Sequence, residues 1–77
     1  MSVLRLAIPS PLRRHFDYLP PSGMRVEDIV ALQPGIRLRV PFGRREVTGY
    51  LLAVSAESDI PVNSLKPALE ILDQSPL

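Results

Sequence analysis

Nine prolines and four glycines divide the 77-residue chain into short pieces, and this division limits what the chain can fold into. Such pieces leave no room for a typical helix of about 11–12 residues with clear periodicity. Strand patterns dominate instead. Ile36, Leu38 and Val40 alternate with Arg37 and Arg39, so the three apolar residues are predicted to face a core and the two arginines to face water.

Other segments carry weaker strand patterns. Strands are predicted over residues 3–8, 15–19, 36–40, 47–55 (as a buried strand) and 65–72, the last as a strand or as a helical turn followed by one. Residues 43–46 are typical of a hairpin connection, and Gly49 is a candidate bend or bulge. Residues 26–32 predict a helix of one or two turns, with apolar positions 26, 29 and 30 on one face.

This pattern predicts a mainly β domain, namely a small antiparallel, partly open, OB-like barrel of about five short strands with at most one short helical turn. We expect residues 1–77 to form a single domain that is a fragment of a longer protein. A chain of this size buries only about 60–65% of the surface that its unfolded form exposes. A deep, enclosed active site is therefore not expected.

The composition excludes several classes of protein. The chain has no cysteine and a single histidine, His15, which excludes a disulfide scaffold, a thiolate metal cluster and a histidine-based zinc site. Its uncharged runs are far shorter than the roughly 20 residues of a membrane span, and the N-terminus lacks a signal-peptide pattern. We predict a cytoplasmic protein without metal or membrane contact.

The small net charge of +1 conceals an asymmetry. Residues 1–48 contain eight arginines and four acidic residues, whereas residues 49–77 contain one lysine and four acidic residues, so the two parts carry +4 and −3. Arginine offers a planar fork of donors that suits phosphate and stacks on rings. A basic front half suggests an anionic partner such as nucleic acid, but a merely solvated surface explains the charge equally well.

Catalytic patterns are weak. The chain has no Walker-type phosphate loop. His15 and Asp17 are two residues apart on a predicted strand and can pair, but no serine stands out as a nucleophile. Glu27 and Asp28 are adjacent and suit the first turn of a helix. We therefore predict that the chain is not an enzyme.

A nucleic-acid site needs cations for phosphate and flat faces for bases. Cations occur in two predicted loops, at Arg13, Arg14, Arg44 and Arg45, and the four aromatic residues are Phe16, Tyr18, Phe42 and Tyr50. A core position is the favoured interpretation for Phe42 and Tyr50. Phe16 differs because it directly follows the basic residues 13–15 and precedes Asp17.

Several motifs in order resemble one known family. They are residues 7–12 (AIPSPL), 16–19 (FDYL), 35–43 (GIRLRVPFG), Gly49, 65–66 (LK) and 70–73 (EILD). Together they cover nearly the whole chain and are similar to the N-terminal 3′ DNA-binding domain of the bacterial replication-restart helicase family PriA, primosomal protein N′. The resemblance implies a non-catalytic module that recognises the 3′-terminal nucleotide, with its free 3′-hydroxyl, of a nascent strand at a stalled fork or D-loop and so positions the helicase.

The resemblance also implies a site. Its residues are Phe16, Asp17, Gly43 and Lys66, with Arg14, Arg44 and Arg45 as outer phosphate contacts. Further partners would be the remaining helicase domains and other primosome proteins, and zinc and ATP are expected only in those missing domains. Residues 25–33 are longer and more acidic than the family pattern.

Two alternatives remain open at this point. The first is a small β-barrel protein-interaction module whose exposed aromatic residues hold a peptide or a partner domain. The second is a small hydrolase that uses His15 and Asp17, which ranks last because no nucleophile is identified.

Overall fold

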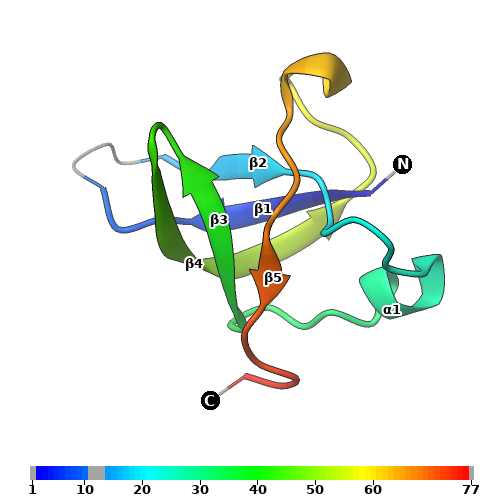
Figure 1. The fold of residues 1–77 in the computed structure, drawn as a ribbon. Coiled ribbons are helices and arrows are strands. Elements are labelled where there is room, and N and C mark those ends of the chain that lie inside the picture. Colours follow the sequence, from blue (N-terminus) through cyan, green and yellow to red (C-terminus); the bar gives the residue numbers. More distant parts are fainter. Residues whose placement is uncertain (1, 11–13, 77) are drawn as a thin grey trace.

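Five strands form a single antiparallel sheet in the order β2-β1-β4-β3-β5 in the computed structural model, which describes residues 2–10 and 14–76 (Figure 1). The elements are β1 (Val3–Ala7), β2 (Phe16–Tyr18), α1 (Val26–Val30), β3 (Arg37–Phe42), β4 (Arg45–Ser55), the 3-10 turn η1 (Val62–Ser64) and β5 (Glu70–Ile71). The prediction of a mainly β domain with five antiparallel strands and one short helix is confirmed.

The two edges of this open sheet approach each other beside β2. The Leu19 amide donates a hydrogen bond to the Lys66 carbonyl at 2.9 Å, and the Ala68 amide donates one to the Leu19 carbonyl at 2.8 Å. These bonds form a short parallel contact between Leu19 and Pro67. The segment that leads from η1 into β5 is thereby held against the end of β2.

The core lies on one face of the curved sheet. Ile36, Leu38 and Val40 are fully buried, as the alternating pattern predicts. Leu4 and Leu6 from β1 are equally buried and belong to the same cluster. Burial of such side chains contributes about 1.5–3 kcal/mol each, so the central strands β1, β3 and β4 hold the domain together.

Two expectations about burial, a buried strand over residues 47–55 and a core position for Tyr50, are wrong. Tyr50 and Leu52 of β4 are 45% and 48% exposed, because the second face of this antiparallel strand is left open to solvent. A core position for Tyr50 is therefore also wrong. In α1 only Ile29 is buried and belongs to the core cluster, while Val26 and Val30 are exposed.

The last strand is much shorter than the predicted range 65–72. Only residues 70–71 pair with β3, and the stretch before them contains η1 and Pro67. Proline has no amide hydrogen to donate to a strand partner, which limits regular pairing there.

Gly49 permits a close approach of β4 to β1 and is not itself the bulge. A Cβ at this position would lie 3.2 Å from the Ala7 carbonyl oxygen and 3.3 Å from side-chain atoms of Leu6 and Ile8. The register shift between the two strands falls instead between Arg5 and Leu6. β-Bulges re-aim side chains at functional sites, and this one lies beside Arg5.

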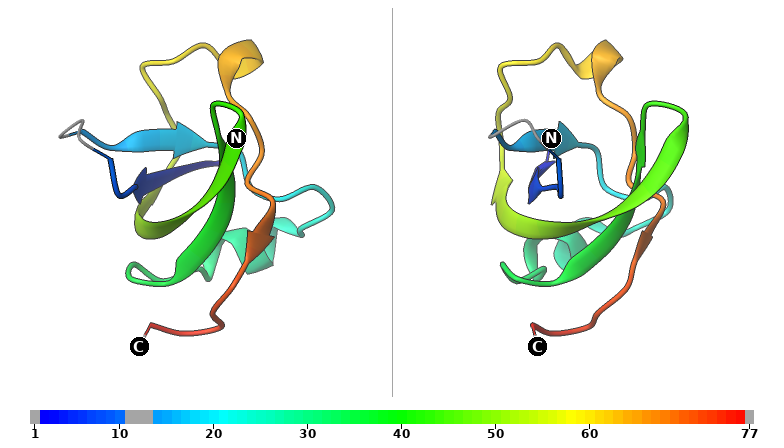
Figure 2. Two further views of the ribbon diagram at one scale, coloured as in Figure 1. Left: turned by 60° about the vertical axis from the view of Figure 1, so that its left-hand side comes forward. Right: turned by 90° about the vertical axis from the view of Figure 1, so that its left-hand side faces the viewer.

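The two ends of the molecule carry different elements. The β3–β4 hairpin turn and η1 lie at one end of the molecule, and α1 and the last residues of the chain lie at the other (Figure 2). None of the helices in the described part of the chain has the length and apolar character needed to cross a membrane.

Candidate nucleic-acid interface

A surface cavity of about 200 Å³ lies between β2, the β3–β4 turn and the segment around η1. It is lined by Phe16, Asp17, Tyr18, Pro41, Phe42, Gly43, Ile60, Ser64 and Lys66. This cavity, called the end pocket below, includes all four pocket residues that the family resemblance implies. Their roles in binding stay predictions, but they do share one site.

Separate stretches of the chain supply the end pocket. Phe16 and Asp17 come from β2, and Gly43 comes from the β3–β4 turn. Lys66 lies between η1 and β5, and its own carbonyl accepts the hydrogen bond from the Leu19 amide. The contact between the sheet edges therefore brings Lys66 to the strand that carries Phe16 and Asp17.

The aromatic wall of the pocket is built by two rings. Phe16 and Phe42 meet edge to face, with 5.1 Å between ring centroids and an interplanar angle of 90°. The guanidinium carbon of Arg14 lies 4.8 Å from the Phe16 ring centroid, a cation–π arrangement. Arg14, predicted as an outer phosphate contact, is thus held beside the ring that is predicted to stack on a base.

Tyr18 lines the end pocket and links two of its strands through a hydrogen bond. Its hydroxyl donates a hydrogen bond of 2.7 Å to the Pro41 carbonyl, which connects β2 to the end of β3. Burial raises the pKa of Tyr18 above its ordinary value, because the charged phenolate would lose hydration. The phenol therefore stays protonated and keeps this bond at neutral pH.

Gly43 occupies a conformation that favours glycine. Its φ is +62°, and Gly43 and Arg44 are the two residues between β3 and β4. Glycine at the first position of a two-residue hairpin turn is typical of a type II′ turn. A Cβ at Gly43 would meet no atom within 4 Å, so the space beside this backbone is open. A ligand can approach the turn backbone closely there.

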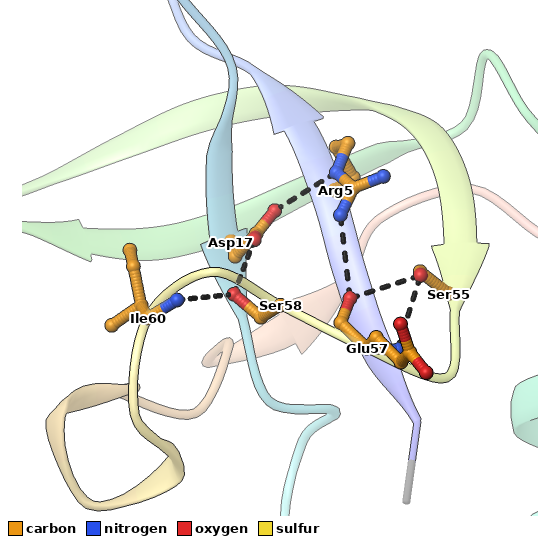
Figure 3. Close-up of polar contacts among 6 residues, drawn as sticks. All are labelled: Arg5, Asp17, Ser55, Glu57, Ser58 and Ile60. Carbon is orange, nitrogen blue, oxygen red and sulfur yellow. Dashed lines mark hydrogen bonds and ion pairs between the residues drawn. The ribbon is translucent and has the colours of Figure 1, made fainter.

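The carboxylate of Asp17 is held by two donors (Figure 3). Arg5 Nε donates to Oδ1 at 3.2 Å, and Ser58 Oγ donates to Oδ2 at 2.5 Å. The Asp17 side chain is only 4% exposed. Sequence reasoning missed Arg5 and Ser58, although Arg5 does interrupt the apolar run of β1 and is the register partner of Asp17 on β2.

A second cavity of about 230 Å³ adjoins the end pocket and shares Asp17 and Ile60 with it. Arg14, His15 and Asp59 complete its lining. The two hydrogen bonds of the Asp17 carboxylate come from Arg5 and Ser58 and not from His15. The His15–Asp17 pair that the hydrolase alternative requires is therefore not formed.

The cations of the described residues fall into two groups. Those paired with carboxylates are Arg5, Arg25, Arg37 and Arg39. Those without an ion pair in the described part of the chain are Arg14, Arg44, Arg45 and Lys66. The second group is the set predicted to contact DNA, and its members lie on or next to the elements that build the end pocket. Arg13 lies outside the described residues.

The fold and the site define a class: a small β-sheet binding domain whose pocket combines aromatic rings with Lys66, a cation without an ion pair in the described part of the chain, as sites for single-stranded nucleic acid combine rings and cations. A family model described as the 3′ DNA-binding domain (3′BD) of PriA matches residues 5–77. The chain belongs to this family of DNA-binding domains, and the resemblance seen in the sequence is confirmed.

Two curated relatives agree with this assignment. The "Replication restart protein PriA" of Haemophilus influenzae (strain ATCC 51907 / DSM 11121 / KW20 / Rd) is 39% identical over 77 residues, which are 100% of this chain and 10% of the relative. The protein of the same name from Bacillus subtilis (strain 168) is 34% identical over 64 residues, 83% of this chain and 8% of the relative. The chain thus spans about a tenth of the length of these relatives.

Proposed function

We propose that this domain binds the 3′-terminal nucleotide of a DNA strand and recognises its free hydroxyl, as part of a replication-restart helicase. The observation that carries the proposal is the presence of an almost buried carboxylate, Asp17, in a pocket that also holds Lys66, a cation without an ion pair among the described residues. A carboxylate opposes general affinity for DNA. It is useful where an uncharged end has to be distinguished from a phosphate.

Phe16 and the cations supply affinity. A terminal base can stack on the aromatic wall, which contributes roughly 1–3 kcal/mol per base and tolerates any base. Lys66, Arg44 and Arg45 neutralise backbone phosphates, and such contacts position the strand without reading its sequence. Gly43 leaves the turn backbone accessible to the strand.

Asp17 supplies selectivity for the end. An ionised carboxylate only accepts hydrogen bonds, so it can accept one from a terminal hydroxyl. A 3′-phosphate at about 4 Å would be repelled by roughly 1 kcal/mol per charge pair in water and about 4 kcal/mol at an effective dielectric of 20. The free hydroxyl is therefore favoured over the phosphate.

Membership of the family supports the proposed role in the cell. The domain would capture the 3′ end of a nascent strand at a stalled fork or D-loop in the bacterial cytoplasm and position the helicase there. Unwinding, ATP binding and zinc binding would belong to further domains, and other primosome proteins would be partners of the whole helicase.

Binding of a 5′-labelled single-stranded oligonucleotide, followed by fluorescence anisotropy at two salt concentrations, tests the proposal. The 77-residue chain should bind a 3′-hydroxyl end about fivefold or more tightly than a 3′-phosphate end, which corresponds to about 1 kcal/mol. Asp17→Ala should remove this preference. Asp59→Ala is the matched control, because Asp59 lines only the adjoining cavity.

Two results would contradict end recognition. Equal binding of both ends that is lost at higher salt would mean that the cations only hold the backbone. Absence of DNA binding at both salt concentrations would favour the protein-interaction module.

A further inference from the structure

Ser58 contacts the end-reading carboxylate directly, although it lies 41 residues away from Asp17 in the sequence. Its hydroxyl donates to Asp17 Oδ2 at 2.5 Å and accepts the Ile60 amide hydrogen bond at 3.1 Å (Figure 3). A hydroxyl has one proton to donate, and the amide of Ile60 only donates. The proton of Ser58 is therefore committed to Asp17.

The other carboxylate oxygen of Asp17 is held by Arg5 from the neighbouring strand β1. Arg5 Nε donates to Asp17 Oδ1 at 3.2 Å, and Arg5 Nη2 donates to the Glu57 carbonyl at 3.3 Å. Arg5 thus connects Asp17 to the same segment that carries Ser58. The last torsion of an aspartate side chain is broad and has no sharp intrinsic preference. These two hydrogen bonds therefore set the plane of the carboxylate.

We propose that Ser58 is a positioning residue for recognition of the 3′-hydroxyl. It holds Asp17 so that the lone pairs not used by Arg5 and Ser58 point at the terminal hydroxyl of the strand. An ionised carboxylate has about four acceptor sites, so two bonds leave room for a third. This inference rests on the proposed function, since it concerns how the same carboxylate reads the end.

Asp17 acts on the strand end in two ways, by accepting a hydrogen bond and by repelling a phosphate. A hydrogen bond weakens steeply when its geometry departs from linear, so acceptance of the 3′-hydroxyl depends on the orientation of the carboxylate. Repulsion of a phosphate depends on charge and distance, so it needs no particular orientation. Loss of Ser58 should therefore weaken recognition of the hydroxyl while rejection of the phosphate persists.

Three oligonucleotides measure both effects: one with a 3′-hydroxyl, one with a 3′-deoxy end and one with a 3′-phosphate. In Ser58→Ala, the advantage of the hydroxyl over the 3′-deoxy end should fall about three- to tenfold, the range of one lost hydrogen bond. The disadvantage of the phosphate relative to the 3′-deoxy end should stay within about twofold. Ser58→Thr keeps a hydroxyl and should restore the wild-type pattern.

Ser55→Ala is the matched control. Ser55 lies near Ser58 at the start of the same segment, and its hydroxyl donates to the Glu57 carbonyl at 2.9 Å and not to Asp17. The Glu57 carbonyl also accepts the Arg5 Nη2 hydrogen bond, but both hydrogen bonds to the Asp17 carboxylate remain in Ser55→Ala, so the three affinities should change less than in Ser58→Ala. Thermal unfolding of each variant verifies that the fold is kept, which is expected because the segment is largely exposed.

Each contrary outcome has a distinct meaning. Tighter binding of the hydroxyl end by Ser58→Ala would mean that Ser58 competes with the strand, which overturns the inference. Equal losses in Ser55→Ala and Ser58→Ala would show a general effect of the segment and would also overturn the inference. An unchanged advantage of the hydroxyl end in Ser58→Ala would overturn it as well. If the wild-type chain does not distinguish the three ends, the proposed function fails first and the positioning role fails with it.

Discussion

The two ends of the domain use the same residue type in opposite ways. At the end that carries α1 and residues 72–76, Arg37 pairs with Asp73 and Arg25 pairs with Glu27 and Asp28, and in the middle of β3 Arg39 pairs with Glu46 and Glu70. Around the end pocket, Arg5 is paired with Asp17, whereas Arg14, Arg44, Arg45 and Lys66 have no carboxylate partner among the described residues.

The difference teaches that net charge is a poor guide to the electrostatics of a small domain. Among the described residues, acids pair with Arg5, Arg25, Arg37 and Arg39 and leave four other cations unpaired, and the net charge of +1 does not show this difference. Local positive potential, and not the total, attracts an anionic ligand. Paired arginines should then serve mainly the fold, whereas unpaired ones should serve binding.

The largest effect is expected from Phe16, one of the two phenylalanine rings that line the end pocket. Phe16→Ala should weaken binding of single-stranded DNA about 5- to 150-fold for any terminal base, because stacking contributes roughly 1–3 kcal/mol. Titration of oligonucleotides with each of the four terminal bases measures this. Phe16→Leu keeps apolar volume but no flat face, so it should lose affinity with less loss of stability.

Tyr50→Ala is the control for the loss of an aromatic ring. Tyr50 lies on β4, is 45% exposed and does not line the end pocket. Comparable losses of affinity in Tyr50→Ala and Phe16→Ala would contradict the assignment of binding to one end of the molecule.

Unpaired and paired arginines can be compared directly with two matched double variants. Arg44→Ala with Arg45→Ala should reduce the slope of log affinity against log salt by about 1.4, since each single-strand phosphate contact contributes about 0.7. If both proteins bind equally at 1 M salt, this slope difference corresponds to a loss of about 25-fold at 0.1 M salt. Anisotropy titrations across a salt series give both quantities.

Arg25→Ala with Arg39→Ala removes the same number of charges from the paired group. Because these side chains are neutralised by neighbouring acids, their removal should change affinity less than about threefold and leave the salt slope almost unchanged. Equal slopes for the two double variants would show that ion pairing does not separate binding cations from structural ones.

Much of the fold could be predicted because its signals are local. The alternation of Ile36, Leu38 and Val40 with two arginines specifies which face of β3 is buried. β4 could not be predicted as well, because Tyr50 and Leu52 are apolar on the face that points away from the core. The pattern of a strand with two apolar faces does not tell which face its neighbours cover.

The site also has a part that the sequence predicts and a part that it does not. The family motifs identify Phe16, Asp17 and Lys66, which the fold brings to one cavity. The network around Asp17 could not be predicted, because it depends on the register that puts Arg5 opposite Asp17 and on the path of the segment that carries Ser58. Register and loop path are set by the whole sheet and not by neighbouring residues.

The smallest effect on DNA binding is expected from the best-formed ion pair at the opposite end. Asp73 accepts hydrogen bonds from the Arg37 amide, Nε and Nη2, each at 2.9 Å. The Arg37 side chain, followed by its amide, holds the pKa of Asp73 below its ordinary value of 3.8. This pair joins the start of β3 to the chain just after β5.

A lowered pKa in the folded state determines the sign of the pH effect. The folded protein holds the ionised form of Asp73, so the stabilisation is fully present above the ordinary carboxyl pKa of 3.8 and is lost as the pH falls through the lower folded value. Asp73→Asn should lower Tm by a few degrees at pH 7. It should also flatten the fall of Tm below pH 4, as thermal unfolding across pH will measure.

Glu70→Gln is the control, because it removes an exposed partner of Arg39 and exposed ion pairs contribute about 0–1 kcal/mol. It should leave Tm nearly unchanged. DNA affinity of Asp73→Asn at neutral pH should stay at the wild-type value, since the variant is remote from the end pocket. A variant that kept its stability but lost DNA affinity would contradict the division between a structural and a binding end, and would assign Arg37 to the DNA interface.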